Sequence, residues 1–281
     1  MSAMPRPLLS YAAELGPSDR DPVRVAEPVE RRRLGRETVL LLGVSLGASA
    51  IWSVLSIIEK LTRNVPLRSQ TTAMNQSATP DRPWLDLGYQ LAGILIQVVP
   101  VALAIYLLAT VLRPSARVGA ARFMGFDRTE PLRDLLRGVG LAALIGLPGL
   151  GFYFLAKAIG INTNVSAANL TDVWWSAPVL TLAAIGNALV EEVVMVGYLF
   201  TRWRQLAWSW PVVIGVSALI RGTYHLYQGF GGFAGNVVMG LVLGYVFART
   251  RRVMPLVICH ALLDIVAFVG YSILTSRGVT V

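Results

Sequence analysis

The sequence has few charged residues, one cysteine and two histidines. Charged side chains make up 15% of its 281 residues, whereas an ordinary soluble domain carries about a quarter. The single cysteine, Cys259, excludes a disulfide within the chain. Any histidine chemistry must use His225 or His260, because the sequence contains no other histidine. The scarcity of charge argues against soluble domains and directs attention to the few polar residues that lie in apolar stretches.

Long hydrophobic runs are what the sequence has in place of charge. Hydrophobic residues account for 54% of the chain, and its mean hydropathy is +0.58. They cluster in blocks of roughly 20 residues, the length that a helix needs to cross a ~30 Å hydrocarbon layer. The blocks are residues 38–58, 88–111, 138–159, 176–200, 210–228, 233–248 and 254–275. We predict an all-α, polytopic transmembrane bundle of seven membrane helices, or eight if a short or re-entrant segment lies within residues 59–87.

The basic residues are distributed unevenly between the blocks. A net charge of +9 fits nucleic-acid binding when the cations line one face, but here they lie between hydrophobic blocks. If the N-terminus is cytoplasmic, eighteen of the 25 lysines and arginines fall on the cytoplasmic side and five on the other. This bias predicts a multi-pass plasma-membrane protein with its C-terminus outside. It also predicts the lipid bilayer, and not nucleic acid, as a partner.

Composition divides the chain into four parts. Residues 1–37 are polar and basic and predict a disordered cytosolic arm. Residues 38–174 contain the first membrane helices, and residues 175–275 form a membrane core that holds the unusual polar side chains. Residues 276–281 are a short tail.

Polar residues at membrane depth are costly and are candidates for function. Three blocks each carry two of them four residues apart, so that both lie on one helix face. The pairs are Asn187 and Glu191, Arg221 and His225, and His260 and Asp264. These faces should meet one another and avoid lipid. Glu192 lies about 100° around the helix from Glu191, so we expect only one of these glutamates at the centre of the cluster.

Two kinds of hydrolytic site fit these residues. Glu191, His225 and His260 could bind a divalent metal such as zinc, which activates a water. Alternatively, no cofactor is required: a glutamate acts as a general base on water, a histidine assists, and other groups stabilise the oxyanion. Both alternatives remain open at the level of sequence.

The spacing of these residues resembles that of the CPBP family of intramembrane endopeptidases, the CAAX protease and bacteriocin-processing or abortive-infection proteins, which share a CAAX prenyl protease 2-like domain. The family pattern is Glu-Glu-x-x-x-Arg, then Phe-x-x-x-His, then His-x-x-x-Asn or Asp. The corresponding segments here are Glu191 to Val196, Arg221 to His225, and His260 to Asp264. The resemblance covers about residues 175–270, the predicted catalytic core.

The resemblance implies an intramembrane protease that cleaves a membrane-associated protein or peptide. By the same resemblance, Glu191 and His225 activate the attacking water and Glu192 supports them. His260 and Asp264 stabilise the tetrahedral oxyanion.

Three departures from the family pattern bear on activity. Val196 replaces the arginine, Arg221 replaces the phenylalanine, and Asp264 stands where asparagine is common. We hypothesise that Arg221 supplies the positive charge missing at Val196. An ionised Asp264 would accept a hydrogen bond and orient His260, or ligate a metal.

The residue pattern also fits other roles and other functions. Arg221 and Asn187 are supporting residues, with Asn187 favoured as a packing residue. Tyr224 and Tyr227 are expected in the aromatic belt at the membrane surface. The alternatives to a protease are a catalytically silent scaffold or immunity factor and, less favoured, an ion-coupled transporter. Nothing in the sequence predicts the oligomeric state.

Overall fold

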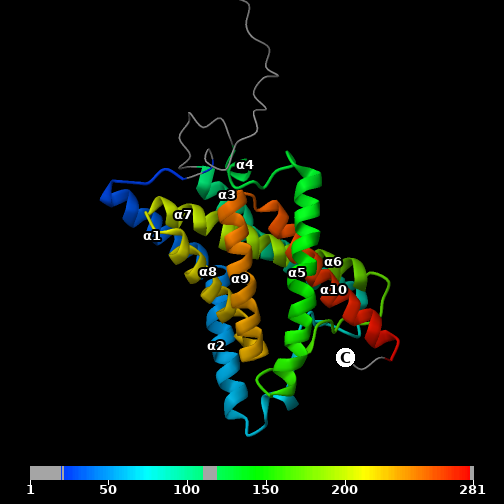
Figure 1. Ribbon diagram of the computed structural model, residues 1–281. Coiled ribbons are helices and arrows are strands. Elements are labelled where there is room, and N and C mark those ends of the chain that lie inside the picture. The colour runs from blue at the N-terminus through cyan, green and yellow to red at the C-terminus, as the bar shows by residue number, and fades with distance from the viewer. Residues whose placement is uncertain (1–19, 21, 110–118, 279–281) are drawn as a thin grey trace, which may run out of the picture.

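The computed structural model describes residue 20, residues 22–109 and residues 119–278. These ranges are mostly helical (Figure 1), as expected for an all-α protein. The α-helices are α1 (Pro28–Gly43), α2 (Leu46–Thr62), α3 (Pro83–Ala109), α4 (Ala120–Phe123), α5 (Pro131–Ala158), α6 (Ser176–Leu189), α7 (Leu199–Gln205), α8 (Trp210–Tyr224), α9 (Phe230–Thr250) and α10 (Met254–Ser276). The remaining elements are the 3₁₀ turns η3 (Leu67–Ser69) and η5 (Leu226–Gln228), the π-helix η4 (Val190–Tyr198) and the strands β1 (Thr71–Ala73) and β2 (Asn164–Ser166).

Five helices in the described ranges are long and apolar enough to cross a membrane, which makes the chain a multi-pass membrane protein. They are α3, α5, the continuous run Ser176–Gln205, α9 and α10. The pair α1 and α2 adds a sixth span if its 51° bend is counted as one crossing. The block at 210–228 falls short, because α8 has 15 residues and a span needs about 20. The predicted count of seven is therefore not reached on length and composition.

Two segments differ from the predicted layout. Residues 28–37, assigned to a disordered arm, form the first part of α1. Pro28 begins the helix, and Leu34 is fully buried, so this stretch has an apolar side to pack. The interval 59–87 contains η3 and β1 in place of an eighth membrane helix. The rest of the predicted arm, apart from residues 20 and 22–27, lies outside the described residues.

The two ends of the bundle have different character. One end, which we call the arginine-rich end, holds the start of α1, helix α4 and the α7–α8 and α9–α10 connections (Figure 1). At the opposite end, β1 and β2 pair in parallel with Thr71 opposite Asn164. Helix α10 packs against α5 and α6, and α8 packs against α9 and α2. Alternating helices therefore connect a cationic end to an end closed by a small β-ribbon.

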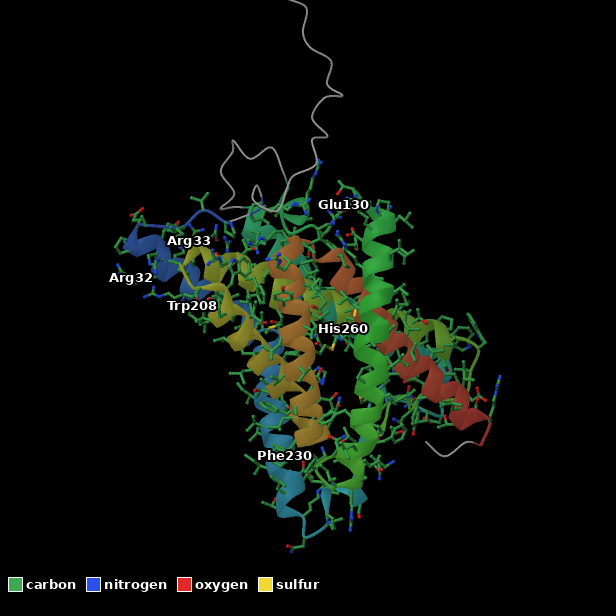
Figure 2. The ribbon with its side chains drawn as sticks, in the orientation of Figure 1. Arg32, Arg33, Glu130, Trp208, Phe230 and His260 are labelled. Atoms are coloured by element: carbon green, nitrogen blue, oxygen red, sulfur yellow. The ribbon has the colours of Figure 1, made fainter. Side chains whose placement is uncertain are left out.

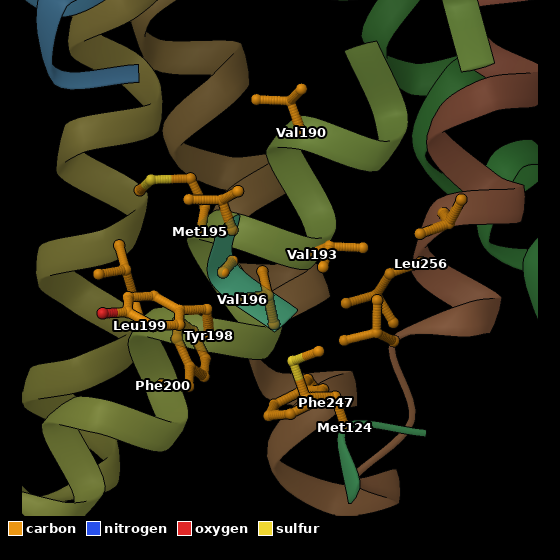
Figure 3. Close-up of a cluster of buried hydrophobic side chains, with 14 of the residues drawn as sticks. Met124, Val190, Val193, Met195, Val196, Tyr198, Leu199, Phe200, Phe247 and Leu256 are labelled. Atoms are coloured by element: carbon orange, nitrogen blue, oxygen red, sulfur yellow. The ribbon is translucent and has the colours of Figure 1, made fainter. Parts of the chain in front are cut away.

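The π-helix η4 lies at the centre of the core. All nine of its residues are buried, and it packs against α3 and α10. Its apolar side chains meet Met124, Phe247 and Leu256 from three other segments (Figure 3). Because η4 is enclosed on every side, its two glutamates are held inside protein and away from lipid.

Candidate active site

The predicted polar residues converge around the first turn of η4. The π-helix admits one extra residue per turn compared with an α-helix, a feature that recurs at functional sites. Here it begins at Val190, so Glu191 and Glu192 both lie in its first turn. His260 comes from α10 and lies mid-bundle, away from the end that carries Arg32 and Arg33 (Figure 2).

Arg221 bridges the two glutamates. Its Nη1 donates to Glu191 Oε2 at 3.3 Å and its Nη2 donates to Glu192 Oε1 at 2.7 Å. The arginine is 1% exposed and Glu192 is fully buried. Two carboxylates at this depth would repel each other and lack hydration, and the guanidinium offsets both penalties. The contact explains why both glutamates reach the cluster, where the helix geometry predicted only one.

The contacts of Glu191 all fall on one of its two oxygens. Oε2 accepts a hydrogen bond of 2.7 Å from the Tyr224 hydroxyl as well as the one from Arg221. The Nε2 atom of His225 lies 3.6 Å from the same oxygen. No described residue donates a hydrogen bond to Oε1. The carboxylate is thus anchored through Oε2 and presents Oε1 as its free acceptor.

His225 lies just beyond the end of α8. It caps the helix, with φ of −101°, and its ring contacts those of Tyr224 and Tyr227, at centroid distances of 4.9 and 6.3 Å. Neither ring nitrogen has a hydrogen-bond partner among the described residues. Two aromatic neighbours fix the orientation of the imidazole, and its nitrogens stay available to a water or substrate.

His260 lies between two acids on the other side of Glu191. Its Nδ1 is 2.7 Å from Glu192 Oε1, and the carboxylate, already paired with Arg221, accepts the hydrogen bond. The Nε2 edge lies 3.8 Å from Asp264 Oδ1 and 3.9 Å from Glu191 Oε2. One ring nitrogen is therefore used for anchoring, and the other faces the centre of the cluster.

A chain of amides holds Asp264. The side-chain nitrogen of Gln97 in α3 donates to Asn187 Oδ1, and Asn187 in turn donates to Asp264 Oδ2 at 3.3 Å. This direction makes Asp264 an acceptor, which fits the orienting role considered for it. Asn187, expected to be a packing residue, is a hydrogen-bonded link between α3, α6 and α10.

Sequence reasoning missed two members of the cluster. Tyr224 was expected in the interfacial belt, but it is 4% exposed and bonded to Glu191. The available signal was its position three residues after Arg221, on the same helical face. Gln97 was a lone amide inside the 88–111 block, which by itself did not indicate a partner.

Val196, which replaces the family arginine, lies in the apolar core. It is 2% exposed and belongs to the cluster around Met124 and Phe247 (Figure 3). Its neighbour Gly197 is so close to Met124 that an added Cβ would lie 2.7 Å from the sulfur. A guanidinium at Val196 would have apolar neighbours in this packing, whereas Arg221 reaches both glutamates.

The arrangement does not fit a metal ion. No group of three or more His, Cys, Asp or Glu side chains in the described ranges has the geometry to hold one. Glu191, His225 and His260, the predicted ligands, surround an oxygen already bound by Tyr224 and Arg221. Arg221 already supplies a positive charge to the carboxylate that would ligate the metal.

Comparison with known proteins agrees with the resemblance noted from the motifs. Residues 173–266 match the family described as Rce1-like, type II CAAX prenyl endopeptidase Rce1-like. The match spans η4, α8 and α9 and reaches past His260 and Asp264 in α10. No curated protein and no solved structure matches the chain.

Proposed function

We propose that this chain, whose residues 173–266 match the Rce1-like family of CAAX prenyl endopeptidases, is an intramembrane endopeptidase. It hydrolyses a peptide bond of a membrane-associated protein or peptide. The observation that carries the proposal is the pairing of Glu191 with His225, at 3.6 Å, inside a buried polar cluster.

The first step is activation of a water by Glu191 and His225. Oε1 of Glu191 takes a proton from the water, while a ring nitrogen of His225 holds the water in place. Tyr224 and Arg221 keep the carboxylate from turning, since both donate to Oε2. The hydroxide then adds to the carbonyl carbon of the scissile bond. In this proposal the activation uses protein groups alone.

The second step is stabilisation of the oxyanion and departure of the amine. In this proposal His260 is an imidazolium: its Nδ1–H donates to Glu192, its Nε2–H is the donor facing the cluster, and Asp264 lies 3.8 Å from Nε2. Fixed donors of this kind typically contribute about 10²–10³-fold to the rate. The proton taken by Glu191 passes to the leaving nitrogen, the carbon–nitrogen bond breaks and a carboxylate product remains.

The test is cleavage of a proteome-derived peptide library by the purified protein in nanodiscs. Glu191→Gln and His225→Ala should each lower the cleavage rate by ~10²–10⁴-fold, the usual contribution of general-base catalysis. Glu59→Gln is the matched control, because Glu59 is exposed and pairs with Arg63 outside the cluster. Activity that survives in both site variants, or no cleavage of any peptide by the wild type, contradicts the proposal.

The silent-scaffold alternative rests on the Arg221 bridge. A guanidinium that neutralises both glutamates could hold α8 against η4 without chemistry. In that case, Glu191→Gln would leave the biological output of the protein unchanged. The peptide assay and the output assay together separate a protease from a scaffold.

A further inference from the structure

A second polar site lies at the β1–β2 end, away from the catalytic cluster. A shallow surface cavity of about 510 Å³, open to the surroundings, is lined by Arg68, Ser69, Phe154, Lys157 and Ala158. The two cations come from segments far apart in sequence, the η3 turn and the last turn of α5. Their convergence on one cavity is a property of the fold and not of a local basic run.

The backbone beneath Arg68 is fixed in place. The side-chain amide of Asn164 donates to the Arg68 carbonyl at 3.1 Å, and the Asn164 backbone N–H donates to Gln70 at 2.9 Å. The aliphatic part of Arg68 also lies against the turn at Gly160, whose φ of +83° favours glycine. The β1–β2 ribbon thus holds Arg68 beside the end of α5.

Neither cation has an acidic partner in the described part of the chain. Lys157 lies 5.9 Å from the centre of the Tyr153 ring, and no carboxylate lies within ion-pair distance of Lys157 or Arg68. Two like charges that face one cavity repel each other unless an anion lies between them. The cavity therefore has the charge of an anion site.

The level of the cavity in the membrane indicates which kind of anion it binds. Helix α5 has 28 residues, a length of roughly 42 Å, whereas the hydrocarbon layer is ~30 Å thick. Lys157, one residue from the helix end, consequently reaches the headgroup region. Phe154, one turn earlier, is 49% exposed, and its position one turn deeper corresponds to the level of the acyl chains. A ligand with a phosphate above an apolar tail matches this order of groups.

We propose that this cavity binds the headgroup of an anionic phospholipid in the leaflet at the β1–β2 end. Arg68 and Lys157 contact the phosphate, the Ser69 hydroxyl can donate to it, and one acyl chain lies along Phe154. The role is independent of peptide hydrolysis, since none of these residues belongs to the cluster around Glu191.

The test is native mass spectrometry of the full-length protein, released from detergent in the presence of phosphatidylglycerol or phosphatidylcholine. The wild type should retain phosphatidylglycerol in preference to zwitterionic phosphatidylcholine. The double variant Arg68→Gln/Lys157→Gln should lower the phosphatidylglycerol-bound fraction at least fivefold, and Arg68→Lys/Lys157→Arg should retain it. Thermal unfolding of each variant shows that the fold is intact.

The control is Arg63→Gln/Arg82→Gln, which removes two cations at the same end that pair with Glu59 and Asp81. Equal loss in the control shows a diffuse charge effect and overturns the proposal. Undiminished binding in the Arg68→Gln/Lys157→Gln variant also overturns it. Displacement of the lipid by an equimolar amount of inorganic phosphate identifies a site for free phosphate and overturns the lipid assignment.

Discussion

At the scale of single residues, Arg221 is the side chain on which the cluster depends. Arg221→Leu removes the cation that bridges two buried carboxylates, and breaking a buried ion pair in this way typically costs about 3–5 kcal/mol of stability. We expect it to abolish cleavage and lower the unfolding temperature. Arg221→Lys keeps the charge and should retain part of the activity, although it loses the two-pronged contact. Peptide cleavage and thermal unfolding measure both effects, and equal activity in the two variants contradicts the assigned role.

Tyr224 offers a finer test, because only its hydroxyl contacts Glu191. Tyr224→Phe removes one hydrogen bond to a charged group, worth about 1.5–3 kcal/mol. We expect kcat to fall by about tenfold or more while KM changes little, since the hydroxyl holds the base and not the substrate. Tyr227→Phe is the matched control, because the Tyr227 hydroxyl contacts Met74 and Gln228. A rise in KM alone would show that Tyr224 acts in binding.

The sequence predicted which residues meet but not which atoms form hydrogen bonds with one another. Three pairs at i and i+4 were enough to predict that Glu191, His225 and His260 gather at one place. Their hydrogen bonds were not predictable, because they depend on the entry of Tyr224 and Gln97 into the cluster. Tyrosine in a membrane helix is common at the surface, so the pattern favoured the wrong position for Tyr224.

At the scale of elements, the α4–α5 connection fixes the start of α10. Val253 N–H donates to the Met124 carbonyl at 2.9 Å, and Arg252 forms two hydrogen bonds with Asp134 at the start of α5. Arg252 also donates to Asp127 at 3.0 Å. These contacts hold the end of the helix that carries His260. The hydrogen bonds to Asp134 outweigh burial and raise the pKa of Arg252, so the arginine stays charged.

Asp127 should make stability depend on pH in the acid range. Burial opposes its ionisation, but hydrogen bonds from Thr129 and Arg252 outweigh burial and lower the pKa of Asp127. Its stabilising contribution is therefore complete above the ordinary pKa of aspartate and is lost as the pH falls below that value and through the lowered pKa. At pH 7, Asp127→Asn should unfold roughly 2–4 °C lower than the wild type, and this gap should close in acid.

The control for Asp127 is Asp81→Asn, whose side chain is 80% exposed. The unfolding temperature of Asp81→Asn should equal that of the wild type at every pH. A gap for Asp127→Asn that stays constant or widens in acid contradicts the expectation. The measurement is thermal unfolding of the purified proteins across a pH series.

Hydrophobic blocks predicted the helices better than they predicted the breaks in them. Every one of the seven blocks contains a helix, because apolar length is a direct requirement of the bilayer. The bend after Gly43 and the early end of α8 at Tyr224 were missed. The π-helical register at Val190 was missed as well, since i→i+4 and i→i+5 hydrogen bonding leave the same apolar composition.

At the scale of the whole molecule, the charge bias predicts the orientation in the membrane. The arginine-rich end should be cytoplasmic and the β1–β2 end external, because lysine and arginine concentrate in cytoplasmic connections. Asp81 lies between β1 and the start of α3, and Arg128 lies in the α4–α5 connection, so the two residues belong to opposite ends of the bundle. Asp81 is exposed, as is Arg128, so each can carry a reporter without disturbing the core.

Cysteine labelling of intact cells tests this orientation. The native Cys259 is fully buried, so it should not react and need not be removed. With a membrane-impermeant maleimide, Asp81→Cys should label in intact cells, whereas Arg128→Cys should label only after permeabilisation. The reverse labelling pattern would show that the protein has the opposite orientation in the membrane. It would then place the paired cations Arg68 and Lys157 in the cytoplasmic leaflet, while leaving the cluster around Glu191 at the same depth in the bundle.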